Sequence, residues 1–156
     1  MGSLYDTDFA VWSAEQASAI RDAGRRRVNA PIDWDNVAEE IESLGISQRL
    51  TLRSRIGTII EHLLKLQVSP ANEPERLWRE TVLRTRRDIE VLLRNSPSLR
   101  REVADMIEDE MASTRTLVRT IMADYGETPR QPVETIIYDE AAILGDWLPD
   151  RTPPPA

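Results

Sequence analysis

The residues best suited to chemistry in this chain are a histidine and a carboxylate. His62 is the only histidine of the 156 residues. Glu110, within "MIEDEMASTRTLV" (106–118), lies on a helical stripe whose other members are mostly aliphatic. Burying a carboxylate costs free energy unless polar partners satisfy it. We therefore expect Glu110 to have polar neighbours.

Further polar side chains are predicted at the height of Glu110. Folding the sequence back at the turns near residues 71 and 95 places residue 81 opposite both residue 62 and residue 110. The resulting polar layer consists of His62, Thr81, Glu110, Ser113 and Thr114. In the structural interpretation, His62 donates a hydrogen bond to Glu110 and the layer sets the register of the helices. Alternatively, the helices splay and Glu110 meets water, or the layer is a small binding site.

A metal site is a further alternative for the same layer. A di-iron site in a helical bundle needs carboxylates from two helices and a Glu-x-x-His pair from each of two others. Glu61 and His62 are adjacent, so they point about 100° apart on a helix. His62 and Glu110 are the candidate ligands if a metal site exists, and we predict no cofactor. With no cysteine, no nucleophile elbow and no Gly-rich phosphate loop, we assign no catalytic residue.

An arginine-rich helix offers a second candidate site. The stretch 76–101 contains eight arginines and three acidic residues. The predicted partner surface lies on the outward side of this helix and consists of Arg79, Leu83, Arg86 and Arg87. An apolar side chain among these cations favours contact with another protein chain. RNA binding by the helix 75–94 is a weaker alternative, because the net charge of −7 opposes phosphate. A solvated face with pairs such as Glu80–Arg84 is the structural alternative.

These side chains must be positioned by helices, since helical periodicity recurs along the chain. Capping signals and periodicity predict helices at about 13–24, 33–45, 47–67 and 75–94, and one from about 97 to just before Gly126. Ser13 and Asp33 are predicted N-caps, Gly45 ends the second helix, and Ser47 begins the third. Short loops between long helices predict an all-α fold, an antiparallel up-down bundle of three or four main helices with short flanking helices. We expect a single helical domain over residues 1–150 and a Pro-rich flexible tail over 151–156.

Composition narrows the class of protein. The chain is 40% hydrophobic and 30% charged, which is typical of a globular protein. It has neither an apolar run long enough to cross a bilayer nor a secretory signal, so we expect a cytoplasmic protein without a membrane partner. The acidic net charge makes nucleic acid an unlikely partner. A protein partner or a homo-oligomer is expected instead.

Six blocks of the sequence carry a family resemblance. They are "YDTDFAVW", "VAEEIESLG", "IIEHLLK", the Trp of "LWRETV", "SPSLR" and "ILGDWLP", in that order from Tyr5 to Pro149. In these blocks the chain resembles the bacterial family catalogued as domain of unknown function number twenty-nine. The resemblance implies a small all-helical domain with no established activity, so no catalytic residues carry over.

The function is therefore open at this point. The leading hypothesis is a non-enzymatic protein-interaction or regulatory module. The alternative is a metal- or small-molecule-dependent enzyme with a polar site around His62 and Glu110.

Overall fold

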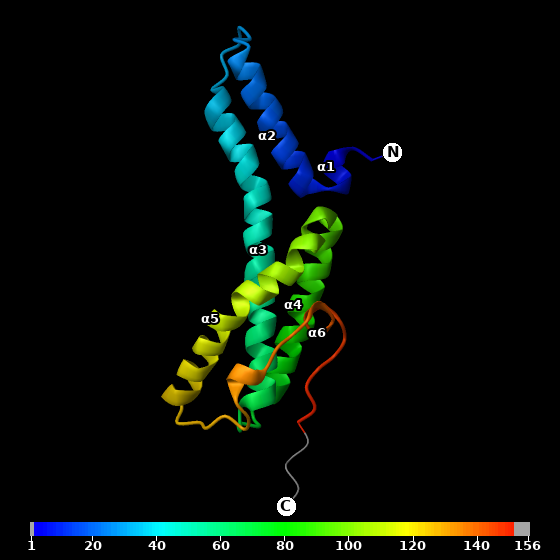
Figure 1. The fold of residues 1–156 in the computed structure, drawn as a ribbon. Helices are drawn as coiled ribbons and strands as arrows, with labels where there is room; N and C mark the ends of the chain where they lie inside the picture. Colours follow the sequence, from blue (N-terminus) through cyan, green and yellow to red (C-terminus); the bar gives the residue numbers. More distant parts are fainter. Residues whose placement is uncertain (1, 152–156) are drawn as a thin grey trace, which may run out of the picture. The chain divides into compact units, whose positions relative to one another are not determined.

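The computed structural model describes residues 2–151, which form helices joined by loops (Figure 1). The α-helices are α1 (Leu4–Thr7), α2 (Phe9–Arg25), α3 (Trp34–Val68), α4 (Glu75–Asn95), α5 (Val103–Asp124) and α6 (Glu140–Leu144). Two 3₁₀ helices, η1 (Pro97–Glu102) and η2 (Val133–Thr135), flank α5. No strand forms within the described residues. The predicted all-α fold with a bundle of long helices is confirmed.

No helix in residues 2–151 combines the length and the apolar character needed to cross a membrane.

The helices group into two compact units. The first, called here the hairpin unit, comprises the described residues up to Leu52 together with Glu90–Arg101. The second, the bundle unit, comprises Arg53–Ile89 together with the described residues from Glu102 onward. Both α3 and α4 contribute to both units. The single helical domain over residues 1–150 stays a prediction.

In the hairpin unit, α2 and the first part of α3 run antiparallel, side by side (Figure 1). The predicted break between Gly45 and Ser47 is wrong, because α3 continues through both residues. A Cβ atom on Gly45 would lie 2.4 Å from the Ser13 hydroxyl oxygen and 3.4 Å from the Ala10 carbonyl oxygen. Gly45 is therefore the place where α2 approaches α3 closely, not a helix end.

The start of α2 also differs from the prediction. The N-cap is Asp8, whose side chain accepts a hydrogen bond from the Val11 N–H at 3.1 Å. Ser13, the predicted cap, is buried in the helix interior. The buried residues of α2 are small and lie along one stripe: Ala10, Ser13 and Ala17. The predicted cap at Asp33 is confirmed, since its carboxylate accepts from the Asn36 N–H at 3.4 Å.

The bundle unit buries large aliphatic side chains. The later part of α3 contributes seven fully buried ones: Ile56, Ile59, Ile60, Leu63, Leu64, Leu66 and Val68. From α4 come Val82 and Ile89, and from α5 come Val103, Met106, Ile107, Met111, Val118 and Met122. The predicted bounds of α4 agree with the structure to within a residue. The predicted end of the last long helix before Gly126 is confirmed, and Gly126 has a φ of 66°.

The C-terminal segment from η2 onward packs on the bundle unit. The Arg151 side chain is 4% exposed and donates to the Ser69 carbonyl oxygen at 2.6 Å. Its guanidinium lies 5.9 Å from the centre of the Trp78 ring. Burial lowers the pKa of Arg151. Residue 151, predicted to belong to a flexible tail, is thus anchored, and residues 152–156 lie outside the described residues.

Candidate functional site

Glu110, the carboxylate on the apolar stripe, is satisfied by an arginine. Arg53 Nε on α3 donates to Glu110 Oε1 at 2.6 Å, and Arg53 Nη2 donates to Asp109 Oδ2 at 2.9 Å. The hydrogen bond to Glu110 raises the pKa of Arg53. The Glu110 side chain is 26% exposed, so the ion pair borders on solvent. A partner for Glu110 was predicted, but the long Arg53 side chain supplies it in place of His62.

Three other members of the predicted layer, His62, Thr81 and Ser113, form hydrogen bonds within their own helices. His62 Nδ1 lies 2.8 Å from the Thr58 carbonyl oxygen. The Thr81 and Ser113 hydroxyls donate to carbonyl oxygens three or four residues earlier, at 2.9 and 3.2 Å. These carbonyls are the nearest acceptors for a short polar side chain on a helix. Thr114 is buried. The predicted hydrogen bond from His62 to Glu110 is therefore wrong, because His62 lies against the Thr58 carbonyl oxygen and Glu110 accepts from Arg53.

Metal-ligating side chains do not gather in the part of the chain that the structure describes. There, no three side chains of the His, Asp and Glu types lie close enough to hold an ion together.

Of the residues of the predicted partner surface on α4, Leu83 and Arg87 are exposed. Leu83 is 54% exposed, and Arg87 beside it is also exposed. Arg79 lies 3.8 Å from Glu75, one helical turn away. The predicted pair Glu80–Arg84 forms at 3.9 Å. Arg86 does not belong to this surface, because its guanidinium turns toward the C-terminal segment.

Arg86 binds three backbone carbonyl groups. Its Nε donates to the Ile143 oxygen at 2.9 Å, and its Nη2 donates to the Ala142 oxygen at 2.8 Å and the Trp147 oxygen at 2.6 Å. The last carbonyl groups of a helix have no N–H donor within that helix. Arg86 supplies the missing donors at the C-terminal end of α6 and therefore caps this helix from α4. Burial lowers the pKa of Arg86. No local pattern in the sequence marks a partner 56–61 residues away.

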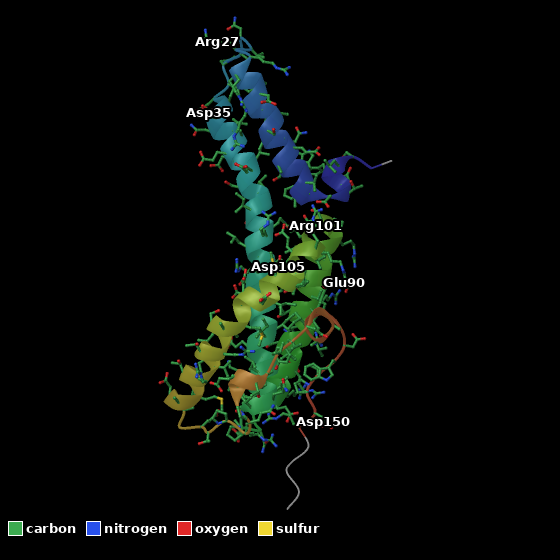
Figure 2. All side chains as sticks on the ribbon, viewed as in Figure 1. Arg27, Asp35, Glu90, Arg101, Asp105 and Asp150 are labelled. Carbon is green, nitrogen blue, oxygen red and sulfur yellow. The ribbon has the colours of Figure 1, made fainter. Side chains whose placement is uncertain are left out.

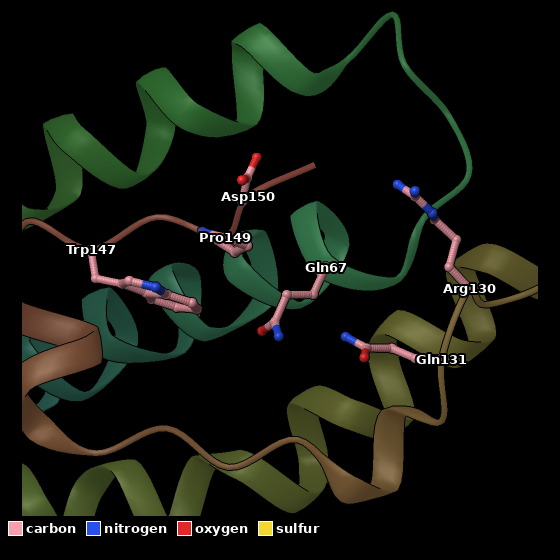
Figure 3. Close-up of a pocket in the computed structure, with 6 residues that line it drawn as sticks. All are labelled: Gln67, Arg130, Gln131, Trp147, Pro149 and Asp150. Atoms are coloured by element: carbon pink, nitrogen blue, oxygen red, sulfur yellow. The ribbon is translucent and has the colours of Figure 1, made fainter. Parts of the chain in front are cut away.

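A cleft lies beside the segment that Arg86 holds (Figure 3). It consists of two adjoining pockets of 370 and 570 Å³ that share Gln67, Gln131 and Trp147. The first pocket is completed by Arg130, Pro149 and Asp150. The second pocket adds Tyr138 and its neighbours along the chain. We did not predict this cleft, because its residues come from the end of α3 and from loops without periodicity.

Tyr138 sets the orientation of one amide in the cleft. Its hydroxyl donates to Gln67 Oε1. Burial raises the pKa of Tyr138, so the phenol stays protonated and remains a donor. The ring of Tyr138 packs against Trp147 with 6.0 Å between the ring centres. Gln67 and Trp147 are thus positioned by the same buried tyrosine.

The hairpin unit presents an apolar surface, called here the apolar hairpin face. Helical geometry places six apolar side chains on one side of the antiparallel pair. They are Phe9, Trp12 and Ile20 from α2, and Val37, Ile41 and Leu44 from α3. Val37 is 39% and Leu44 48% exposed. Arg21 and Glu42, which form an ion pair at 2.6 Å, lie on the opposite side of the pair.

An aromatic cluster extends this face at the base of α2. The ring of Tyr5 on α1 lies 5.7 Å from that of Phe9 and 4.9 Å from that of Trp12. Phe9 and Trp12 stack at 5.5 Å. Tyr5 is 54% exposed, so the cluster reaches solvent.

The fold of residues 2–151 defines an all-helical protein. A family model described as Domain of unknown function DUF29 matches residues 4–148. The chain belongs to this family, and the predicted resemblance is confirmed.

One solved structure is similar over almost the whole chain. It is the crystal structure of an alpha-helical protein of unknown function from Rhodospirillum rubrum, with a TM-score of 0.75. The two sequences are 20% identical, and the match covers 92% of this chain and 90% of the other. At this identity the likeness shows the fold alone. No curated protein matches the chain.

Proposed function

We propose that the protein is an interaction module whose apolar hairpin face binds an amphipathic helix of a partner protein. The observation that carries this proposal is the exposure of Val37 and Leu44 of α3 on one side of the antiparallel α2–α3 pair. A helix binds such a surface through apolar residues spaced three and four apart, as in other helix-in-groove complexes. Ile41 lies between Val37 and Leu44 on the same side of α3, so the three side chains form a continuous apolar stripe.

Charge indicates the chemistry of the partner. Residues 1–52 contain nine acidic and five basic residues. Two of these arginines already face carboxylates, Arg21 at Glu42 and Arg25 at Asp22. Glu40, at the border of the face, is exposed. The end of the hairpin carries both signs, with Arg27 and Asp35 labelled there in Figure 2. The partner helix should therefore flank its apolar stripe with basic residues.

The test uses two fluorescently labelled model helices, one of leucine and lysine and one of leucine and glutamate. Fluorescence anisotropy should show that the 156-residue chain binds the lysine peptide, and that salt weakens this binding. Leu44→Asp should abolish binding, because it places a charge in the middle of the apolar stripe. Leu83→Asp is the matched control, since Leu83 is 54% exposed on α4.

Two results would contradict the proposal. If Leu83→Asp abolished binding and Leu44→Asp did not, the interaction surface would be the one on α4. If light scattering showed a dimer that Leu44→Asp dissociates, a second copy of the chain would cover the face in place of a partner helix.

A further inference from the structure

The cleft beside Trp147 presents a defined set of hydrogen-bonding groups. Because Tyr138 occupies Gln67 Oε1, the Nε2 group of Gln67 is the end of this amide that can donate into the cleft. Tyr138 is 5% exposed and thus protected from competing water. Gln131 contributes a second amide from an exposed position. In Figure 3 the Gln131 side chain extends toward Gln67, and both amides lie in the space between Trp147 and Arg130.

Trp147 adds a flat apolar surface at the same cleft. Its side chain lines both pockets and is 44% exposed. The Arg86 guanidinium holds the Trp147 carbonyl oxygen at 2.6 Å, and Tyr138 packs against the indole. The ring is therefore supported before any ligand arrives, which reduces the entropy that binding would cost.

We propose that this cleft binds a purine base, with adenine as the best match. Adenine places an exocyclic N–H donor beside a ring-nitrogen acceptor, and a glutamine amide pairs with both at once. Gln131 would accept from the exocyclic amine through Oε1 and donate to the adjacent ring nitrogen through Nε2. The Gln67 Nε2 group would donate to a further ring nitrogen, and the indole of Trp147 would stack on the base. Pockets of 370 and 570 Å³ fall in the range that small ligands occupy.

The charge around the cleft favours a free nucleoside over a nucleic acid. Asp139 and Asp150 line the two pockets together with Arg130. The whole chain carries a net charge of −7. Both features oppose the accumulation of phosphates that a polynucleotide requires. This inference does not depend on the proposed partner helix.

Isothermal titration calorimetry of the full chain with adenosine tests the inference. Purine riboside, which lacks the exocyclic amine, should bind about 10-fold more weakly, the range expected for losing part of a bidentate contact. Gln131→Leu should weaken adenosine binding by about the same factor and remove the preference between the two nucleosides. Gln131 is exposed, so this variant should fold normally. Gln16→Leu, an exposed glutamine of α2, is the matched control and should bind like the wild type.

Three outcomes would overturn the inference. The first is no saturable binding of adenosine at millimolar concentration. The second is unchanged binding by both Gln131→Leu and Trp147→Ala, with thermal unfolding confirming that both fold. The third is binding of single-stranded oligoadenylate without binding of adenosine. Leu44→Asp, which tests the interaction module, should leave adenosine binding unchanged, so the two proposals can fail separately.

Discussion

The two parts of α3 pack against their neighbours with side chains of different size. In the hairpin unit, α3 meets α2 through small residues, with Gly45 against Ser13 and Ala38 fully buried. In the bundle unit, the same helix buries six large aliphatic side chains from Ile56 to Leu66. Small residues bring backbones close but remove little apolar area from water, whereas each buried Ile or Leu contributes about 1.5–3 kcal/mol. The pairing of α2 with α3 through small residues leaves Val37 and Leu44 exposed, and these are the side chains on which the proposed partner helix would bind.

The polar contacts differ between the units as well. In the hairpin unit, the short Asp8 side chain accepts from the N–H and hydroxyl of Ser98 at 2.8 and 2.9 Å, while Arg21 and Glu42 form an ion pair between side chains at 2.6 Å. In the bundle unit, long arginines reach backbone carbonyls of the C-terminal segment, as Arg86 and Arg151 do. The bundle unit therefore depends on single side chains that each make several contacts.

Removing Arg86 should give the largest effect. We expect Arg86→Ala to lower the free energy of unfolding by about 3 kcal/mol, because several hydrogen bonds from a charged donor are lost together. Urea unfolding measures the change. Arg87→Ala, at the exposed neighbouring position, should cost less than about 0.5 kcal/mol. Equal effects of the two variants would show that Arg86 is an ordinary surface residue.

Two glycines of α3 should respond with opposite sign. Gly45→Ala places a Cβ 2.4 Å from the Ser13 hydroxyl oxygen and should destabilise the protein by about 1–3 kcal/mol. Gly57→Ala meets its first neighbour, Glu110 Oε2, at 3.5 Å. At this distance the added methyl group makes an ordinary van der Waals contact without strain. Because alanine has a better helix propensity than glycine, we expect the free energy of unfolding to rise by about 0.5–1 kcal/mol. Thermal unfolding of both variants, with Ser13→Gly added to Gly45→Ala as a rescue, separates close packing from propensity.

Alkaline pH should destabilise the bundle unit through Tyr138. Its folded pKa is raised by burial, so the folded chain holds this proton more tightly than the unfolded chain. The contribution is fully present below the unfolded pKa of about 10 and fades as pH rises toward the folded value. Unfolding measured by urea at increasing pH should show this loss, and Tyr138→Phe should reduce it. An equal loss in Tyr138→Phe would assign the effect to other groups.

The smallest effect is expected at Glu110. Its ion pair with Arg53 is partly exposed, with side-chain exposures of 26% and 42%, and such pairs contribute little and are screened by salt. Glu110→Gln should therefore shift the urea midpoint less than Gly45→Ala does, and high salt should remove the shift. A large, salt-independent loss would mean that Glu110 is a buried structural group, as the polar-layer interpretation assumed.

The sequence by itself determined the all-helical class and several of the helix ends. Periodicity identified α4 and the end of α5, because burying one face of a helix requires spacings of three and four. Asp33 was correctly assigned as a cap, since its partner is three residues away. Six ordered blocks identified the family.

The tertiary structure alone decided what each ambiguous residue does. A glycine in a helical pattern can end the helix or admit a neighbouring helix, and the approach of α2 decides this for Gly45. An arginine on a helix can be solvated or bind a distant segment, and the course of the C-terminal segment decides this for Arg86. The length of the side chain decides which residue pairs with Glu110. The Arg53 guanidinium extends to the Glu110 carboxylate, while the His62 ring lies within hydrogen-bond distance of the Thr58 carbonyl oxygen. A sequence pattern indicates contacts between residues that are close in the chain. The contacts of Gly45, Arg86 and Arg53 instead join residues more than thirty positions apart, so they depend on how the helices pack.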